Sequence, residues 1–293
     1  EKESLSALYS AIYAVLVARQ FKVKGLGRLC LPAGILTPHS SRINVLLRTK
    51  LEALLSGSEQ VLDMGCGSGI LTLITAQQMQ ALAGTGSVSA TDINPNCCIA
   101  TEINIARYGL AEHARALAAS DLFGNIPAGS QFDLIIANLP WFDMQMEDIY
   151  TEHPDLKLAL VDTDFRILTR FLNEAAAYLR PGCPVLLIYG YKASTVETAK
   201  PQVERIIADN GFEIADVSAI TKDNSPAGVY LYEIRAAGTA GSETYGFEGS
   251  LTAENVQGLV RAVREGRSEE RPAELALINR YLGDNFEWFQ KAL

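Results

Sequence analysis

Residues 61–69 of the chain read VLDMGCGSG and join two apolar stretches of different character. The residues before them suit a buried strand, and residues 70–83 form a longer apolar run that is compatible with a helix. Glycines at alternate positions allow a sharp turn that brings the backbone close to a ligand. The helix that follows points unpaired N–H groups to the same place. We therefore predict a strand, a ligand-binding glycine loop and a helix.

The rest of the chain repeats this alternation of strands and helices. After the first strand at 60–63, the patterns predict strands at 88–92, 114–118, 133–137, 184–189, 212–217 and 229–235, and helices at 94–108, 162–179 and 195–210. Such alternation predicts an α/β fold, a doubly wound, mostly parallel seven-stranded sheet of the Rossmann-like kind. Ligands of these sheets bind outside the carboxyl ends of the strands.

Composition and periodicity divide the chain into four parts. They are an N-terminal helix, hairpin and cap region (1–56), the sheet domain (57–237), a glycine-rich linker (238–250) and a C-terminal helical extension (251–293). The extension is too short for an ordinary core of its own. We therefore expect it to pack on the sheet domain or on a second copy, which would make a homodimer.

Charge and cysteine content narrow the functional classes. The net charge of −9 disfavours long nucleic acids as the main partner. Residues 4–51, in contrast, hold seven basic residues and no acidic one, which indicates either a solvated basic face or a patch for an acidic substrate. The five cysteines lack zinc-site spacing and the three histidines are scattered, so we expect no metal. Free thiols, and the lack of an apolar run of about 20 residues, predict a cytoplasmic protein without a membrane segment.

The acid and glycines of residues 63–69 follow the spacing D-x-G-x-G-x-G, not the dinucleotide spacing G-x-G-x-x-G. This pattern resembles the S-adenosylmethionine loop of class I methyltransferases. The resemblance implies S-adenosylmethionine as cofactor and S-adenosylhomocysteine as product. The part of the loop expected to receive the amino acid end of the cofactor comprises Met64, Gly65, Cys66, Gly67 and Gly69.

Three carboxylates end predicted strands or turns near this loop. Asp63 would help to hold the ammonium group of the cofactor, directly or through water. Asp92 can accept hydrogen bonds from two ribose hydroxyls, with Ile93 against the adenine, although a helix N-cap is the alternative for Asp92. Asp121 can accept from the exocyclic amine of adenine while Leu122 covers the ring; a turn-forming aspartate is the alternative there.

The sequence Asn138-Leu139-Pro140-Trp141 directly follows the fourth strand in chain order and indicates the reaction type. The Asn138 side-chain carbonyl and a backbone carbonyl can hold the N–H groups of a planar amide or aromatic amine. That arrangement aims the nitrogen lone pair at an electrophilic methyl group, and Trp141 offers a face for stacking. Such catalysis is mostly positioning and electrostatics. A structural turn is the alternative.

Together these residues resemble the amino-methylating methyltransferases with an N-P-P-Y signature, and within them the HemK-type protein-(glutamine-N5) methyltransferases. The resemblance covers residues 35 to about 235, including LTPHSSR at 36–42 and a DxDF-like stretch at 162–165. It implies that Asn138 and the Leu139 carbonyl hold an amide. It also implies cofactor contacts by the glycine loop and the three aspartates, with Thr37 and His39 nearby.

The chain departs from that family pattern in three ways. Leu139 replaces the first proline, and Trp141 replaces the tyrosine. We also expect the N-terminal helical domain that the glutamine methyltransferases use for their protein substrate to be missing or much shortened. These departures bear on the release-factor substrate more than on the chemistry.

We therefore predict an S-adenosylmethionine-dependent enzyme that methylates an amide or amino nitrogen of a small molecule, peptide or protein. Three alternatives remain open: methylation of an RNA base amine, O-methylation of a small molecule, and a non-catalytic module that binds the cofactor. A nicotinamide-dependent oxidoreductase is disfavoured by the glycine spacing.

Overall fold

The computed structural model describes residues 19–23, 26–31, 41–141, 158–221 and 226–237. The predicted N-terminal helix, the linker and the C-terminal extension lie outside these residues, as do Thr37 and His39. The predicted domain boundaries therefore stay predictions, and so does a homodimer through the extension.

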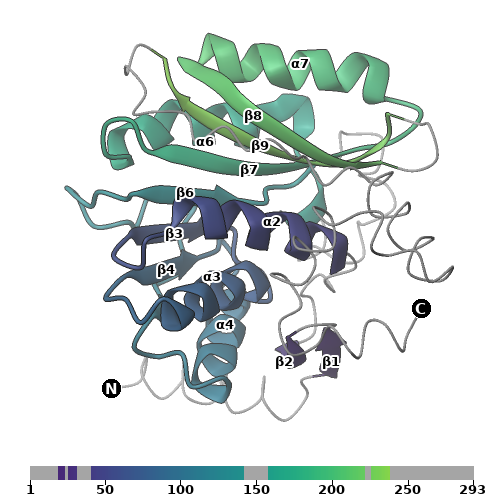
Figure 1. Cartoon of the computed structure of the whole chain (residues 1–293). Coiled ribbons are helices and arrows are strands. Elements are labelled where there is room, and N and C mark those ends of the chain that lie inside the picture. The colour runs from purple at the N-terminus through teal and green to yellow at the C-terminus, as the bar shows by residue number, and fades with distance from the viewer. Residues whose placement is uncertain (1–18, 24–25, 32–40, 142–157, 222–225, 238–293) are drawn as a thin grey trace, which may run out of the picture.

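A seven-stranded sheet forms the centre of the described part (Figure 1). Its strands are Gln60–Met64 (β3), Ser87–Thr91 (β4), Ala114–Ala116 (β5), Leu134–Ala137 (β6), Pro184–Tyr191 (β7), Phe212–Thr221 (β8) and Gly228–Ala236 (β9). Their order is β5-β4-β3-β6-β7-β9-β8. The first five strands of that order pair in parallel, and only β9 runs antiparallel to its two neighbours. The predicted doubly wound, mostly parallel sheet is confirmed.

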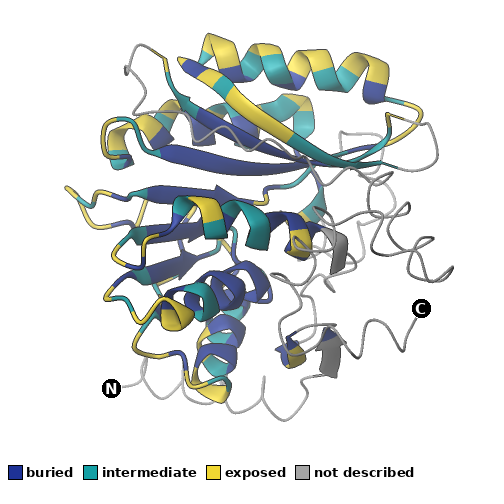
Figure 2. Cartoon of the chain, in the orientation of Figure 1, coloured by how far each residue is buried: buried dark blue, intermediate teal, exposed yellow. Residues whose placement is uncertain are grey.

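Helices cover both faces of this sheet and divide the apolar interior into two clusters. The helices are Ser41–Leu54 (α2), Ile70–Ala81 (α3), Pro95–Arg107 (α4), Arg166–Tyr178 (α6) and Val196–Asp209 (α7). Residues of α2, α3 and α4 share one cluster with Val61, while residues of α6 and α7 share the other with Leu62. Neighbouring strand residues thus face opposite layers, which explains why the central strands read as unbroken apolar runs (Figure 2).

The predicted hairpin is present as a separate two-stranded sheet. Strands Arg19–Val23 (β1) and Gly27–Leu31 (β2) pair antiparallel, and β2 contacts α4. The hairpin begins at Arg19, within the predicted N-terminal region 1–56.

One predicted helix begins later than expected. The expected helix at 162–179 is preceded by a 3-10 turn, Thr163–Phe165, and α6 begins at Arg166. The Asp162 carboxylate accepts hydrogen bonds from the backbone N–H groups of Ile167, at 2.8 Å, and Leu168, at 3.0 Å. Because that side chain satisfies the free N–H groups of the first helical turn, Asp162 lies before the helix and not in it.

The antiparallel strands are also longer than expected: β8 and β9 reach residues 221 and 236. Among the described helices, none is long and apolar enough to cross a membrane.

Candidate functional site

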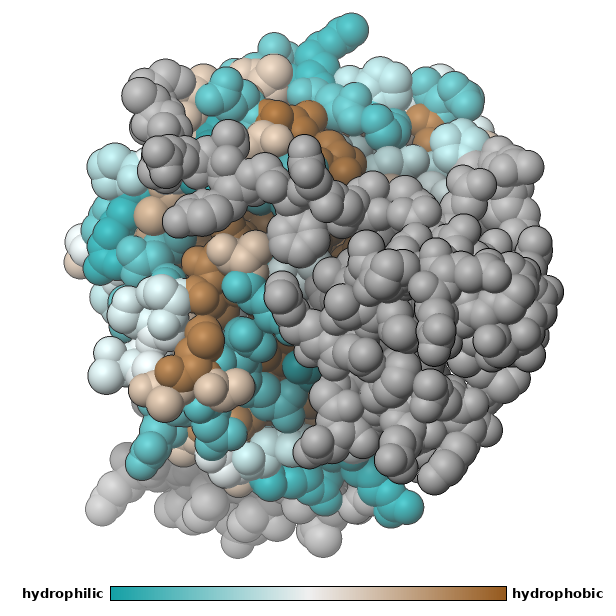
Figure 3. Space-filling view, viewed as in Figure 1, coloured by the Kyte–Doolittle hydropathy of each residue, from teal (hydrophilic) through white to brown (hydrophobic). Residues whose placement is uncertain are grey.

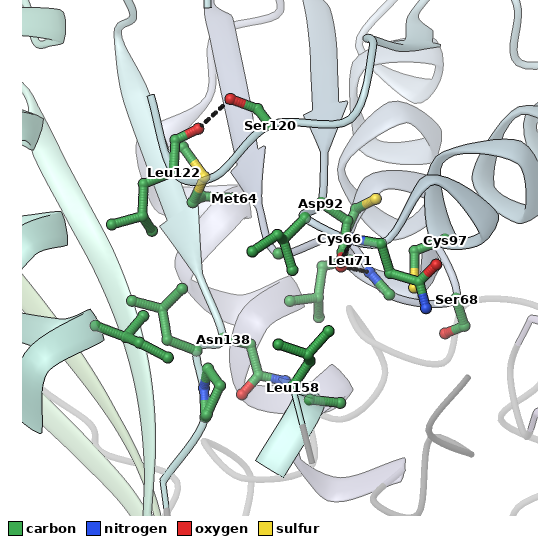
Figure 4. Close-up of a pocket in the computed structure, with 18 of the residues that line it drawn as sticks. Met64, Cys66, Ser68, Leu71, Asp92, Cys97, Ser120, Leu122, Asn138 and Leu158 are labelled. Atoms are coloured by element: carbon green, nitrogen blue, oxygen red, sulfur yellow. Dashed lines mark hydrogen bonds between the residues drawn. The ribbon is translucent and has the colours of Figure 1, made fainter. Parts of the chain in front are cut away.

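A cavity lies at the carboxyl ends of the central parallel strands (Figure 4). Its wall combines the glycine loop after β3, the start of α4 after β4, the turn at 120–122 and the turn that follows β6. The predicted site residues that line it are Met64, Gly65, Cys66, Gly67, Asp92, Ile93, Asp121, Leu122, Asn138, Leu139 and Pro140. The structure thus brings most of the predicted residues to one place.

The glycine loop needs its glycines for two different reasons. Gly67 has a φ of +53°, a left-handed conformation, and a Cβ there would meet nothing within 4 Å. Gly69 also has a positive φ, but a Cβ there would lie 2.8 Å from the Thr101 hydroxyl oxygen on α4. Gly67 therefore leaves an open stretch of backbone toward the cavity, while Gly69 lets the loop pack closely on α4.

Asp92 fixes this loop at the end of β4. Its carboxylate accepts a hydrogen bond from the backbone N–H of Gly67 at 2.9 Å and another from Asn94 at 2.9 Å. Burial raises the pKa of this carboxyl, although both backbone bonds oppose the rise. The N-cap of α4 is Asn94, whose side chain accepts from the N–H of Asn96. Asp92 therefore keeps acceptor capacity at the cavity wall.

Asp63 lies deeper than the other carboxylates. It is fully buried and does not line the cavity; one oxygen accepts a hydrogen bond from the Thr72 hydroxyl of α3 at 2.5 Å. The other oxygen has no hydrogen-bond partner among the described residues. Loss of hydration raises the pKa of Asp63 to about 7, despite the Thr72 bond. The structure places this acid against α3 behind the loop.

The turn at 120–122 presents an acid and an apolar side chain to the cavity. Asp121 is paired with Arg170 of α6, whose two terminal nitrogens lie 3.2 and 3.1 Å from the carboxylate oxygens. Leu122 has a φ of +49°, and its carbonyl accepts from the Ser120 hydroxyl at 2.6 Å. Sequence reasoning missed Arg170, because nothing local connects two residues 49 positions apart.

The Asn138–Trp141 turn divides between the cavity and the core. Asn138, Leu139 and Pro140 line the cavity, but Trp141 is not among its lining residues. The Trp141 indole lies against Gly190 of β7: a Cβ at Gly190 would fall 2.1 Å from its Cε3 atom. The structure therefore places the indole on a strand and not on the cavity wall.

Sequence reasoning also missed part of the apolar wall. Leu158, Ala159 and Ile167 line the same cavity as Asn138, and Figure 4 shows Leu158 at its border. Leu158 is 48% exposed and Ile93 is 47% exposed, so two of the exposed large apolar side chains border the cavity. In the view of Figure 3, hydrophobic side chains gather in a strip left of the centre, beside hydrophilic residues.

Asn104 of α4, also missed, connects the hairpin to the glycine loop. Its amide oxygen accepts from the Cys30 N–H at 2.7 Å, and its amide nitrogen donates to the carbonyls of Cys30 and Ser68, both at 3.0 Å. The side chain is fully buried, so these bonds satisfy its polar atoms without water. One amide thus holds two segments that are far apart in sequence.

The chemistry of this wall fits a nucleoside-like ligand. Open backbone at Gly67, a carboxylate at Asp92, and apolar side chains at Ile93 and Leu122 offer hydrogen-bond acceptors and a surface for a flat ring. Among the described residues, no group of His, Cys, Asp or Glu could hold a metal ion.

The known proteins that this chain resembles are methyltransferases. Residues 45–140 match the family model described as ribosomal protein L11 methyltransferase (PrmA). The ribosomal protein uL3 glutamine methyltransferase of Neisseria meningitidis is 28% identical over 146 residues, which cover 48% of this chain and 46% of that protein. The ribosomal RNA small subunit methyltransferase C of Hamiltonella defensa is 28% identical over 171 residues, or 58% and 43% of the two chains.

A solved structure supports the fold alone. The crystal structure of the tRNA m1G37 methyltransferase of M. jannaschii aligns with a TM-score of 0.51 and 14% identity, covering 75% of this chain and 55% of that one. The chain spans less than half the length of the two curated relatives named above.

Proposed function

We infer that this chain, which has the fold and the family match of the class I methyltransferases, is itself an S-adenosylmethionine-dependent methyltransferase, and we propose that it methylates an amide nitrogen of a protein or peptide. One observation carries the proposal. The glycine loop, the end of β4, the turn at 120–122 and Asn138 line a single cavity at the carboxyl edge of the sheet.

The wall described above would hold the cofactor by its polar and apolar ends. The Gly67 backbone and Asp92 would bind its amino acid and ribose parts, and Ile93 and Leu122 would contact the adenine. When bound, S-adenosylmethionine supplies a methyl group that is electrophilic because it is attached to a sulfonium. Asp63 would support the loop from behind through its bond with Thr72, without a direct place on the wall.

Asn138 would orient the acceptor. Its side-chain oxygen and the backbone carbonyl of Leu139 can accept from the two N–H groups of a primary amide, which fixes the nitrogen in the cavity. The neighbouring wall consists of Leu139, Pro140, Leu158 and Ile167 and is apolar. Because moving an unpaired charge out of water costs on the order of several kcal/mol, this apolar surrounding favours a neutral amide over a charged amine.

A relative named for glutamine methylation supports an amide acceptor, and a relative named for ribosomal RNA methylation makes an RNA base amine the second candidate. The net charge of −9 favours the first. We also propose that the protein acts in the cytoplasm. Its five cysteines are free, which suits a reducing compartment.

The proposal is tested with the full chain and S-adenosylmethionine labelled in its methyl group. A library of glutamine-containing peptides and a ribosomal RNA preparation serve as the two acceptors. We expect label on glutamine side chains of the peptides. Label on RNA alone would show that the acceptor is an RNA base and not a protein amide. Failure to bind S-adenosylhomocysteine in calorimetry would refute the proposed methyltransferase function.

A further inference from the structure

Gly190 and Trp141 form a matched pair at the carboxyl edge of the sheet. A Cβ added at Gly190 would lie 2.1, 2.3 and 2.9 Å from three atoms of the indole, Cε3, Cζ3 and Cδ2. Contacts under 3 Å do not occur for real Cβ atoms, and the obstacle is a rigid ring. The lack of a side chain at Gly190 therefore creates the place that the indole occupies.

Gly190 and Trp141 lie close in the fold to the turn that carries Asn138. β6 and β7 are parallel neighbours with Ala137 opposite Leu187, and the turn that begins at Asn138 leads directly from β6. The indole packs against both apolar clusters, on the two faces of the sheet. It is therefore fixed from both sides, three residues after the side chain that faces the cavity.

The turn itself needs such an anchor. Leu139, unlike a proline, does not fix its own φ angle, so the backbone between Asn138 and Pro140 has more freedom than a turn with two prolines. Leu139 is 5% exposed and belongs to the cluster of α6 and α7. Packing of Leu139 at one point and of Trp141 at another thus replaces the stiffness that a second proline would give.

We propose that Gly190 is a positioning residue. The space left by its missing Cβ, here called the seat, holds the Trp141 indole, and the packed indole keeps Asn138 in place at the cavity. The effect on methyl transfer rests on the proposed function, whereas the packing of Trp141 on Gly190 does not. The seat also implies that Trp141 acts as an anchor of the turn and not as a surface for the acceptor.

The first experiment tests the seat without any acceptor. Trp288, the other tryptophan, is replaced by Phe so that Trp141 reports alone. Gly190→Ala should shift the emission of Trp141 to longer wavelength, and should raise the unfolding equilibrium constant about tenfold or more because of overpacking. In a Trp141→Ala background the same Gly190→Ala change should be neutral or stabilising, since alanine suits a strand better than glycine does. An unchanged emission spectrum, or additive effects of the two changes, would overturn the seat.

The second experiment tests its consequence. Gly190→Ala should leave the Kd of S-adenosylhomocysteine within about threefold while kcat for a methylated glutamine peptide falls at least about tenfold, as misplacement of a catalytic group predicts. A full kcat in Gly190→Ala would refute the positioning role. If the wild-type chain itself methylates no peptide, the proposed acceptor fails instead, and the emission and stability data still decide the seat.

Discussion

The two halves of the cavity are held in place by different forces. On the glycine-loop side, hydrogen bonds fix the backbone: Asp92 accepts from Gly67, and Asn104 donates to Ser68. On the Asn138 side, the turn is fixed by packing, with Leu139 in a core cluster and Trp141 on Gly190. Polar bonds can preorganise a loop for a polar ligand, whereas packing sets the position of a single catalytic side chain. Changes on the first side should therefore alter cofactor binding, and changes on the second should alter turnover.

Among changes on the glycine-loop side, Asp92→Ala should weaken cofactor binding most strongly. The change removes acceptors for the N–H groups of Gly67 and Asn94 together with the expected ribose contact. Loss of the two expected bonds from the ribose hydroxyls to a charged group predicts S-adenosylhomocysteine binding weaker by about a hundredfold or more. Calorimetry measures the Kd, with Asp216→Ala on β8 as a control outside the cavity wall. A Kd within threefold of wild type would show that the carboxylate does not hold the ligand.

Asn104→Ala should weaken the same side less and through the backbone. It leaves the Cys30 N–H, the Cys30 carbonyl and the Ser68 carbonyl without their partner in the interior, which costs about 1–3 kcal/mol of stability. We expect cofactor affinity to fall about tenfold as the loop loses its anchor. Asn210→Ala, an asparagine at the end of α7, is the matched control. Lower stability with unchanged affinity would limit Asn104 to a structural role.

Asp63→Asn should change how stability depends on pH. The pKa of Asp63 is about 7 in the folded protein, above its ordinary 3.8, so the folded state binds the proton more tightly than the unfolded state does. The resulting stabilisation is present in full below the unfolded pKa and is lost as pH rises toward 7. Urea unfolding from pH 4.5 to 8 should show a smaller decline for Asp63→Asn than for wild type. Parallel curves would indicate that Asp63 does not titrate in this range.

Arg170→Ala should have the smallest effect. The guanidinium and the Asp121 carboxylate are each about half exposed, with 50% and 57% of the side-chain surface accessible. Exposed pairs contribute roughly 0–1 kcal/mol, so S-adenosylhomocysteine affinity should change less than about fivefold. A larger loss in calorimetry would mean that Arg170 positions Asp121 for the adenine.

The sequence alone predicted features that depend on neighbours in the chain. The glycine loop, Asp92 and Asn138 each follow directly from a strand end, and parallel strands bring such ends to one edge. The two-layer covering of the sheet follows in the same way from alternating strands and helices. Local pattern therefore sufficed for the fold and for most of the cavity wall.

Contacts between distant positions could not be predicted in this way. Asn104 reads as one more polar residue of a helix until Cys30, 74 positions away, is placed beside it. Gly190 reads as a weak point in a strand, but a glycine is needed there because the indole of Trp141 occupies the space of a side chain. Asp162 reads as part of a helix because its apolar neighbours continue the helical period. In each case the missing information was a tertiary partner, not a residue type.

The most direct test of the account compares binding with turnover in Asn138→Ala. The account predicts that S-adenosylhomocysteine binds this variant within about threefold of wild type, while transfer of the labelled methyl group to a glutamine peptide falls about a hundredfold or more. Asn210→Ala, treated identically, should match wild type in both measurements. Undiminished transfer by Asn138→Ala would contradict the claim that this side chain orients the acceptor in the cavity.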